Sequence, residues 1–455
     1  MITVLILIFF LGYLAITLEV PLKLDKTVPA LLTASVLWGL LAIGFNSGWF
    51  SVIDNNGLVY NILKENKEFQ IEGFHAVLSH HFAATAEILI FLIGAMTIVE
   101  LIDLHQGFDF FKQIIKTKSK VKLLWIVGII GFLLSAIIDN LTATIVIISI
   151  LRKLVVNKQE RIWFSALIVI ATNAGGAWSP IGDVTTTMLW ISNKLTAAGL
   201  IDFVVLPSIT CFVIPFYIAS KLKVFQGEIK VFGTNSNQDS LLSSNKMLIV
   251  GLSAIVFVPI FKILTHLPPY IGMIFSLGVV WLYSEYVHPE ENFDKSNKNL
   301  SVKNALSRIE LSSILFFLGI LMSVACLESV VFGEINNQQL GTLRYAAEKL
   351  NVAIPNQDLV VVLIGFVSAI FDNVPLVAAT IGMYTQEIDN PIWHFIAYCT
   401  GTGGSMLIIG SAAGVAAMGI EKIDFVWYFK KISWLALIGF LSGALVFILI
   451  EYLNF

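Results

Sequence analysis

The sequence predicts an all-α polytopic membrane protein: an inverted repeat with two re-entrant helical hairpins, two broken transmembrane helices and about 10 full spans. Its composition is the first reason, since 57% of the 455 residues are hydrophobic, 13% are charged and the mean hydropathy is +0.85, which is more apolar than a soluble core requires. The second is a series of apolar runs, each about 20 residues long. The third is a polar motif that occurs twice in apolar sequence, "SAIIDNLTAT" from Ser135 and "SAIFDNVPLVAAT" from Ser368.

Uninterrupted apolar runs are predicted to be transmembrane helices because each can cover the hydrocarbon thickness of a bilayer. They cover residues 2–18, 27–45, 81–101, 203–220, 247–264, 270–287, 311–327 and 433–450. The first run lacks a basic segment and a small-residue cleavage site, so we expect it to be retained rather than removed as a signal peptide. Cys211, Cys326 and Cys399 lie in separate apolar segments and predict neither a metal cluster nor a disulfide framework.

The distribution of basic residues predicts the orientation of the chain in the membrane. Loops assigned alternately to two sides place 19–26, 103–122, 152–161, 221–246, 288–310 and 421–431 together, and these hold 22 of the 28 Lys and Arg residues. Because basic loops stay on the cytoplasmic side, we predict that this side is cytoplasmic. Both termini then lie on the outer side of a bacterial cytoplasmic membrane.

Each Asp-Asn motif lies in a segment that is too short to cross the membrane twice. Residues 121–151 are preceded by "KTKSKVK" and followed by "RKLVVNKQER", so this segment begins and ends on the cytoplasmic side. It has 31 residues, whereas two helical crossings need roughly 40. We therefore predict a hairpin that enters and leaves by one face. The second copy, residues 358–387, has acidic ends and is predicted to enter from the outer side. Such a tip is tolerated only against protein or water.

The repeat continues after each hairpin. "ALIVIATNAGGAWSPIGDVTTTMLWISNK" and "FIAYCTGTGGSMLIIGSAAGVAAMGIEK" share a Thr-x-x-Gly-Gly break, followed by Gly182 and Gly410 at matching positions. They predict helices broken in mid-membrane, at 161–195 and 391–420, as in many inverted-repeat transporters. The predicted organisation is N-terminal scaffold helices (1–80), a first repeat (81–232), a cytoplasmic linker (233–245), further scaffold helices (246–310) and a second repeat (311–455).

Acidic residues near the membrane centre are functional candidates because an ionisable side chain there is costly. Those in the repeated motifs are Asp139, Asp183 and Asp372. Oxygen ligands suit a small hard cation, and further oxygens come from Asn140, Thr142, Thr185, Thr186, Thr187, Asn373, Ser405 and Ser411. No Lys or Arg lies within either tip or break, so an anionic substrate would have no fixed counter-charge, although helix N-termini could partly serve.

A carboxylate removed from water favours its protonated form, so a proton and a cation can compete for one site. A site that opens alternately to each face with either ion bound exchanges the two. For any single acid the alternative is a structural hydrogen-bond partner. Glu87 and Glu100 are weaker candidates, and the His80–His81 pair is interpreted as interfacial rather than as a metal site or pH sensor. The absence of HExxH, a phosphate-binding glycine loop or a nucleophile with a base argues against an enzyme, and no cofactor is predicted.

At these residues the sequence resembles the NhaD-type sodium/proton antiporters of the ion transporter superfamily. The motifs "IDNLTAT", "ATNAGGAWSPIGDVTTTMLW", "FDNVPLVAA" and "GTGGSMLIIGSAAG" carry the resemblance, which covers most of 82–428. It implies ion-site residues Asp139, Asn140, Asn173, Asp183, Thr185 and Thr186 in the first repeat and Ser368, Asp372, Asn373, Ser405 and Ser411 in the second. Na⁺ itself is expected at Asp139, Asn140, Asn173 and Asp183.

The implied activity is exchange of Na⁺, and of Li⁺, for H⁺, which would serve sodium and pH homeostasis. Likeness to the superfamily also implies a homodimer whose hairpin bundles move as an elevator against the scaffold. The dicarboxylate branch has uncharged Ser-Asn-Thr tips, from which Asp139 and Asp372 depart toward cation chemistry. An arsenite permease, a carboxylate symporter and a membrane sensor without transport are the alternatives.

Overall fold

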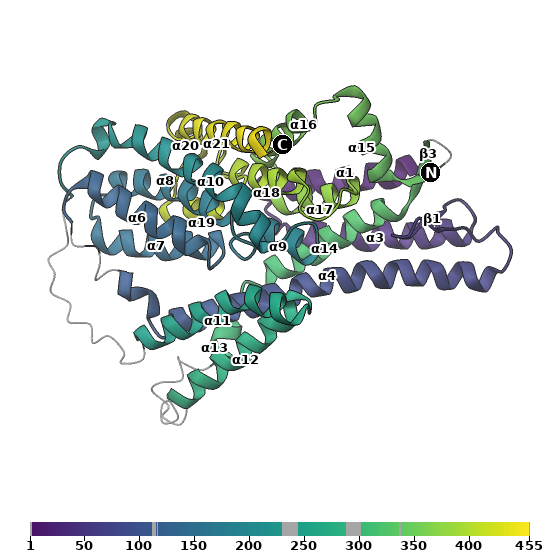
Figure 1. Cartoon of the computed structure of the whole chain (residues 1–455), viewed down its shortest axis with the longest axis horizontal. Helices are drawn as coiled ribbons and strands as arrows, with labels where there is room; N and C mark the ends of the chain where they lie inside the picture. The colour runs from purple at the N-terminus through teal and green to yellow at the C-terminus, as the bar shows by residue number, and fades with distance from the viewer. Residues whose placement is uncertain are drawn as a thin grey trace. The chain divides into compact units, whose positions relative to one another are not determined.

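The computed structural model describes residues 2–111, 115, 117–229, 244–287, 302–335 and 338–454. Nearly all of its elements are helices (Figure 1), so the prediction of an all-α polytopic protein is confirmed. The predicted linker 233–245 lies outside the described residues except for Ser244 and Asn245, where α11 begins. The described residues form two units, which are treated separately.

Unit 1 contains the N-terminal helices and the segment before the second hairpin. Its elements are α1 (Ile2–Thr17), α2 (Glu19–Leu22), α3 (Thr27–Asn46), β1 (Val52–Ile53), β2 (Val59–Tyr60), most of α4 (Lys67–Leu104), α14 (Leu311–Ser329), β3 (Val331–Ile335), β4 (Gln338–Gly341), α15 (Thr342–Ala353) and most of α17 (Asn373–Met383).

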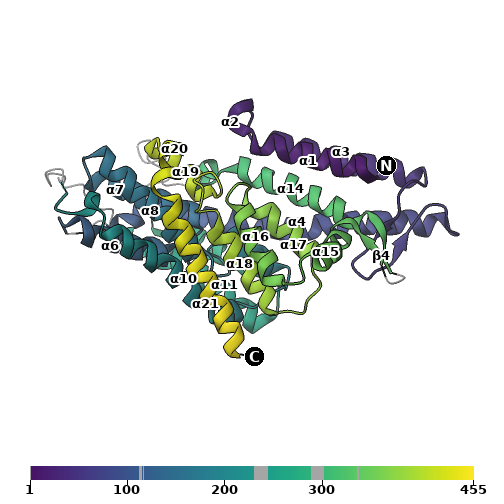
Figure 2. The ribbon, with the colours of Figure 1, turned by 90° about the horizontal axis from the view of Figure 1, so that it is seen from above.

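The core of unit 1 is the close packing of α3 against α14. A Cβ added at Gly319 would lie 2.6 Å from the carbonyl carbon of Ala30, so the two backbones approach directly. The indole Nε1 of buried Trp38 donates a hydrogen bond of 2.8 Å to the carbonyl of Met322, which satisfies the polar end of a large apolar side chain. Figure 2 shows α1 running beside α3. Small residues and one satisfied polar group therefore fix this helix pair.

Two loops of unit 1 contain short β-hairpins that the sequence does not indicate. β1 pairs antiparallel with β2, and β3 pairs antiparallel with β4. The helix α4 also begins at Lys67 rather than near residue 81 and has 38 residues, a length of about 57 Å. Strands of two to five residues are too short to show a clear alternation of apolar and polar residues, so the sequence does not indicate them.

Unit 2 contains both helix breaks and both Asp-Asn motifs. Its elements are the end of α4, η1 (Gly107–Asp109), α6 (Lys120–Ser135), α7 (Asn140–Leu154), α8 (Lys158–Gly176), α9 (Val184–Ile191), α10 (Ala197–Ser220), η2 (Lys223–Phe225), α11 (Ser244–Thr265), α12 (Pro269–Val287), α13 (Val302–Arg308), α16 (Gln357–Ser368), the start of α17, α18 (Pro391–Gly403), α19 (Ala412–Glu421), α20 (Phe425–Lys431) and α21 (Ser433–Asn454).

The repeated motifs interrupt helices where the sequence predicts. The first predicted hairpin is the pair α6 and α7, which pack against each other and against α8 (Figure 1). The second is α16 followed by α17. Each predicted broken helix is likewise a pair, α8 with α9 and α18 with α19, separated by residues 177–183 and 404–411. The Gly-Gly sequences stand at the ends of α8 and α18, where the helices stop.

Six helices of the described residues are long and apolar enough to cross a membrane: α3, α4, α10, α11, α14 and α21. The consecutive helices α15 and α16 bring the number to seven if they form one span. The other predicted spans, at 2–18 and 270–287, are the helices α1 and α12. The three cysteines are buried and unpaired.

Candidate functional site

Four helices of the repeated motifs begin at one polar cluster. Asp139 is the N-cap of α7, Asp183 is the N-cap of α9, Ser411 is the N-cap of α19, and Asn373 is the first residue of α17. An N-cap side chain accepts a backbone N–H that the helix leaves unpaired. A helix N-terminus also carries about half a positive charge. The helix breaks therefore create several places that favour a carboxylate.

Asp183 is the centre of this cluster and is only 2% exposed. Its Oδ1 accepts hydrogen bonds from the backbone N–H and the hydroxyl of Thr185, at 2.8 and 2.7 Å. Its Oδ2 accepts one from Nδ2 of Asn140 at 2.5 Å. The amide of Asn373 lies 3.4 and 3.5 Å from the two carboxylate oxygens. Both Asp-Asn motifs thus present an amide to the same carboxylate.

Asn173 joins the two halves of the sequence and is fully buried at the end of α8. Its Oδ1 accepts a hydrogen bond of 3.0 Å from Asn140. Its Nδ2 donates to the hydroxyls of Ser405 and Ser411, each at 2.9 Å. A single amide therefore connects the first hairpin with the break in the second broken helix.

Each half of the sequence contains a serine hydrogen bond from the first hairpin helix to the broken helix. The hydroxyl of Ser135, at the end of α6, donates to the carbonyl of Thr172 at 2.6 Å. The hydroxyl of Ser368, at the end of α16, donates to the carbonyl of Thr400 at 2.9 Å. Ser368 was predicted as an ion-site residue, and its hydroxyl proton is directed to the backbone.

A glycine near the end of each break allows the hairpin tip and the break to touch. A Cβ added at Gly182 would lie 2.6 Å from the carbonyl oxygen of Ser135, and one at Gly410 would lie 2.5 Å from that of Ala369. Real Cβ atoms do not come so close to backbone oxygen, so only glycine fits without displacement. The matching positions noticed in the sequence are therefore matching contacts.

Asp139 and Asp372 lie at the edge of the cluster. The carboxylate of half-buried Asp139 accepts hydrogen bonds from the N–H and hydroxyl of Thr142, at 2.8 and 2.6 Å. Asp139 and Asp372 both interact electrostatically with Asp183. The structure thus places Asp183, Asn140 and Asn173 in one hydrogen-bonded network, with the other two acids beside it.

The predicted threonines of α9 support the break. The hydroxyl of Thr186 donates to the carbonyls of Ser179 and Asp183, at 2.7 and 2.9 Å. The hydroxyl of Thr187 donates to the carbonyl of Pro180 at 2.9 Å. These hydroxyls shape the backbone around Asp183.

The weaker candidates have partners of their own. Glu100, near the end of α4, interacts electrostatically with Asp103, Arg308 and Asp139. His80 lies 2.6 Å from the amide of Asn55, and Nε2 of His81 lies 3.0 Å from the hydroxyl of Ser329. Within the described ranges, no group of three or more His, Cys, Asp or Glu side chains could hold a metal ion. Carboxylate, amide and hydroxyl oxygens instead gather around Asp183.

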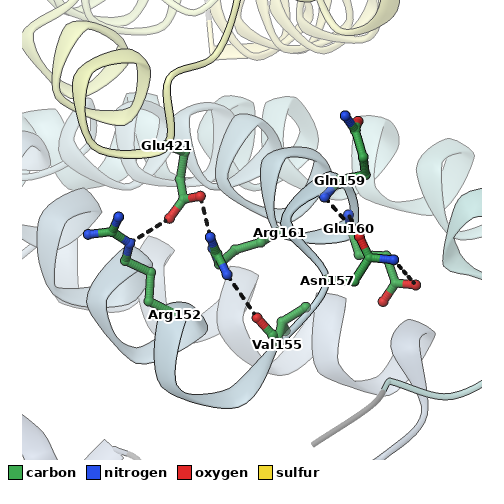
Figure 3. A network of polar contacts seen from close by, with 7 residues as sticks. All are labelled: Arg152, Val155, Asn157, Gln159, Glu160, Arg161 and Glu421. Atoms are coloured by element: carbon green, nitrogen blue, oxygen red, sulfur yellow. Dashed lines mark hydrogen bonds and ion pairs between the residues drawn. The ribbon is translucent and has the colours of Figure 1, made fainter. Parts of the chain in front are cut away.

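A second polar cluster, which the sequence does not indicate, contains Glu421 (Figure 3). Its carboxylate lies 3.0 Å from Nε of Arg152 and 2.8 Å from Nε of Arg161. A second omission is Tyr428, whose buried hydroxyl donates to the carbonyl of Ser405 at 2.8 Å. One feature of the sequence could have indicated this cluster. Glu421 is an acidic residue directly after a predicted broken helix, on the side of the predicted basic loops.

Comparisons with known proteins agree on a membrane transporter. A family model described as a citrate transporter (CitMHS) matches residues 13–386. Sodium/proton antiporter 1 of Arabidopsis thaliana is 43% identical over 99% of this chain and 72% of its own length. Sodium/proton antiporter 2 of the same plant is 40% identical over 98% and 99%. The Na⁺/H⁺ antiporter NhaD of Alkalimonas amylolytica is 29% identical over 97% and 89%.

A solved structure shows the same fold at low sequence identity. The crystal structure of the YdaH transporter of Alcanivorax borkumensis, described as having an unusual topology, is 12% identical to this chain. It superposes with a TM-score of 0.59 over 94% of this chain and 98% of that one. At this identity the likeness concerns the fold alone.

Proposed function

This chain belongs to the family of NhaD-type sodium/proton antiporters, and from that premise we propose that it exchanges Na⁺, and Li⁺, for H⁺ across a membrane. The buried carboxylate of Asp183 carries the proposal. Its hydrogen bonds come from Asn140, Asn373 and Thr185, and among the described residues no Lys or Arg is paired with it. A desolvated carboxylate takes up either a proton or a small hard cation.

We propose that transport occurs by alternating access in an inverted repeat. The paired serine contacts and the paired close approaches at Gly182 and Gly410 support the repeat, because the same local packing is built twice. In such folds the transported ion binds where the broken helices meet. Asn173 bonds to both halves at that place. The hairpins and broken helices would move together as an elevator, with the predicted regions 1–80 and 246–310 as scaffold.

Asp183 and Asp139 form the core of the proposed ion site, and Asp372 completes it. Asp183 is already surrounded by amide and hydroxyl groups. The carboxylate of Asp139 accepts its hydrogen bonds from Thr142 and would have to turn away from that residue to bind the ion. Asn140 and Asn173 supply further oxygens once their amides reorient toward a cation. No resident cofactor enters this mechanism.

The cellular setting of the proposal follows from the loops and the family. We place the basic loops on the cytoplasmic side of a bacterial cytoplasmic membrane, with both termini outside. We also propose a homodimer and a role in sodium and pH homeostasis. Light scattering of the detergent-purified protein measures the dimer, because the mass of two chains is about 100 kDa, twice the 50.2 kDa of one.

Reconstituted protein tests the function directly. Liposomes with a trapped pH dye and an imposed proton gradient should lose the gradient when Na⁺ or Li⁺ is added, and keep it when K⁺, arsenite, citrate or succinate is added. Collapse by citrate or succinate alone would replace the proposal with a carboxylate symporter, and collapse by arsenite alone with an arsenite permease. Failure of every solute to act would favour a membrane protein without transport activity.

The family model's description gives a specific reason to include citrate in this assay. A citrate site needs fixed positive groups for its carboxylates. The network around Asp183 instead presents an acid, two amides and hydroxyls. We therefore expect no citrate flux above that of empty liposomes.

Substitution of Asp139 by Asn should abolish exchange while the protein still folds. Asn is as good an N-cap as Asp, so α7 should still begin at the same residue, but the ionisable oxygen is lost. Na⁺-driven proton flux, normalised to the amount of folded protein, measures the effect. Flux equal to that of the wild type would remove Asp139 from the mechanism.

A further inference from the structure

Three helices of unit 2 run between the proposed ion site and a second polar cluster. The helix α7 begins at Asn140 and carries Arg152 in its last turn. The helix α8 carries Arg161 in its first turn and Asn173 near its end. The helix α19 begins just after Ser411 and ends at Glu421. Each helix thus has one end at the ion site and the other at Glu421.

Glu421 holds the far ends of these three helices together. Its side chain is fully buried, and each carboxylate oxygen faces one guanidinium group, at 3.0 Å for Arg152 and 2.8 Å for Arg161 (Figure 3). Arg161 also donates from Nη1 to the carbonyl of Val155 at 3.0 Å, which fixes the connection between α7 and α8. One carboxylate therefore sets the relative position of α7, α8 and α19 along their lengths.

The opposite ends of the same helices carry the bonds that connect the two halves of the site. Ser411 accepts from Asn173 at 2.9 Å, and Asn173 accepts from Asn140 at 3.0 Å. The helix α19 has ten residues, or about 15 Å of rigid rod. A slide of α19 by even 1 Å at Glu421 would therefore reach Ser411 almost undiminished and strain its hydrogen bond with Asn173.

Stability alone is a weak reason for this arrangement. Removing two charges from water costs free energy, and the attraction within a buried ion pair often does not repay it. Apolar residues of the same size in place of such a pair often make the protein equally stable. The contact with Arg161 is also a hydrogen bond, and a directional contact of this kind fixes register in a way that apolar contacts do not. Positioning therefore explains the buried carboxylate better than stability does.

We propose that Glu421 is a positioning residue for the ion site: it fixes α19 against α7 and α8, and so sets the distance between Ser411 and Asn173. The inference rests on the proposed function, because the site it positions is the proposed cation site. Glu421 contacts Arg152 and Arg161 and would not be a ligand of the cation. It acts through the length of α19.

The test substitutes Glu421 by Gln, which keeps the shape and removes the charge. The Na⁺ concentration for half-maximal exchange should rise about tenfold, which is the usual effect of losing a residue that orients ion ligands without binding the ion. The maximal rate per folded protein should stay near that of the wild type. Arg152→Gln removes the more exposed of the two partners and should shift the same parameter in the same direction. The Arg152→Gln variant therefore tests the same inference if Glu421→Gln does not fold.

Glu160→Gln is the matched control. Glu160 lies next to Arg161, but its ion pair of 3.0 Å is with Lys120 and joins α6 to α8. Its ion pair and side-chain hydrogen bond are with Lys120 and Asn157 and not with a residue of α19, so the half-maximal Na⁺ concentration should not change. The inference is overturned if Glu421→Gln and Arg152→Gln leave this concentration unchanged, or if all three variants raise it equally.

A second measurement separates this inference from the proposed function. The backbone N–H groups of Gly414 and Val415 are hydrogen bonded to Ser411, at 3.2 and 3.0 Å. Their hydrogen–deuterium exchange, measured without Na⁺, should be faster in Glu421→Gln and unchanged in Glu160→Gln. If the wild type shows no Na⁺-driven flux but this difference is present, the proposed function fails and the positioning role stands. Equal exchange in all three proteins contradicts the positioning role, whatever the flux.

Discussion

Replacing Asp183 with Asn is expected to reduce Na⁺-driven proton flux to the level of empty liposomes. The carboxylate accepts hydrogen bonds from Asn140 and Thr185 and faces the amide of Asn373. An Asn in its place cannot carry the proton, and its own NH₂ group would face donors. Flux and Na⁺ binding by calorimetry both measure the loss.

Asp424→Asn is the matched control for this substitution. Asp424 is the N-cap of α20 and accepts from the N–H of Trp427 at 2.8 Å, as Asp183 does from that of Thr185. Because Asn and Asp are comparable N-caps, the control should retain wild-type flux and thermal stability. Full activity of Asp183→Asn would show that transport does not use this carboxylate.

The second large effect is expected from a single methyl group at either tip. Gly182→Ala and Gly410→Ala would each place a Cβ less than 3 Å from a backbone carbonyl of the adjacent hairpin, which must then move away. Overpacking of this kind costs about 1–3 kcal/mol. The hairpin tip and the break would also separate at the proposed ion site, so exchange should fall in both variants along with the melting temperature.

Gly419→Ala provides the control because it lies in α19 with no atom within 4 Å of the added Cβ. Alanine favours a helix more than glycine by about 1 kcal/mol, so this variant should be as stable as the wild type or more so. If Gly182→Ala and Gly410→Ala match it in stability and flux, the tight tip contacts are not needed. A loss in only one of the pair would show that the two halves are unequal in function.

The sequence predicted the helices and their interruptions because both depend on local properties. Apolar length located the spans, and Gly-Gly pairs and Asp-Asn motifs located the breaks. The contacts within the site depended on packing between distant segments. Nothing in the sequence indicated that Asn173 bonds to Ser411 or that the hydroxyls of Thr186 and Thr187 are directed to the backbone.

The charged cluster at Glu421 was missed for a related reason. Arg152 and Arg161 were read as part of the cytoplasmic excess of basic residues, which is a property of composition rather than of pairing. The ion pairs form because α19 packs against α7 and α8, and that packing joins segments about 260 residues apart. The strands β1 to β4 were missed because strands of two to five residues leave no clear periodicity.

The four helix N-termini at the site also set its local charge. Asp139, Asp183 and Asp372 interact electrostatically and contribute about −3 when ionised, whereas four N-termini at about +0.5 each contribute about +2. The sum is about −1, so one monovalent ion or one proton brings the site close to neutrality. A divalent ion would leave it about one charge positive in a medium of low dielectric constant. If the proposed ion site is correct, the number of helices that begin there therefore favours a monovalent cation over a divalent one.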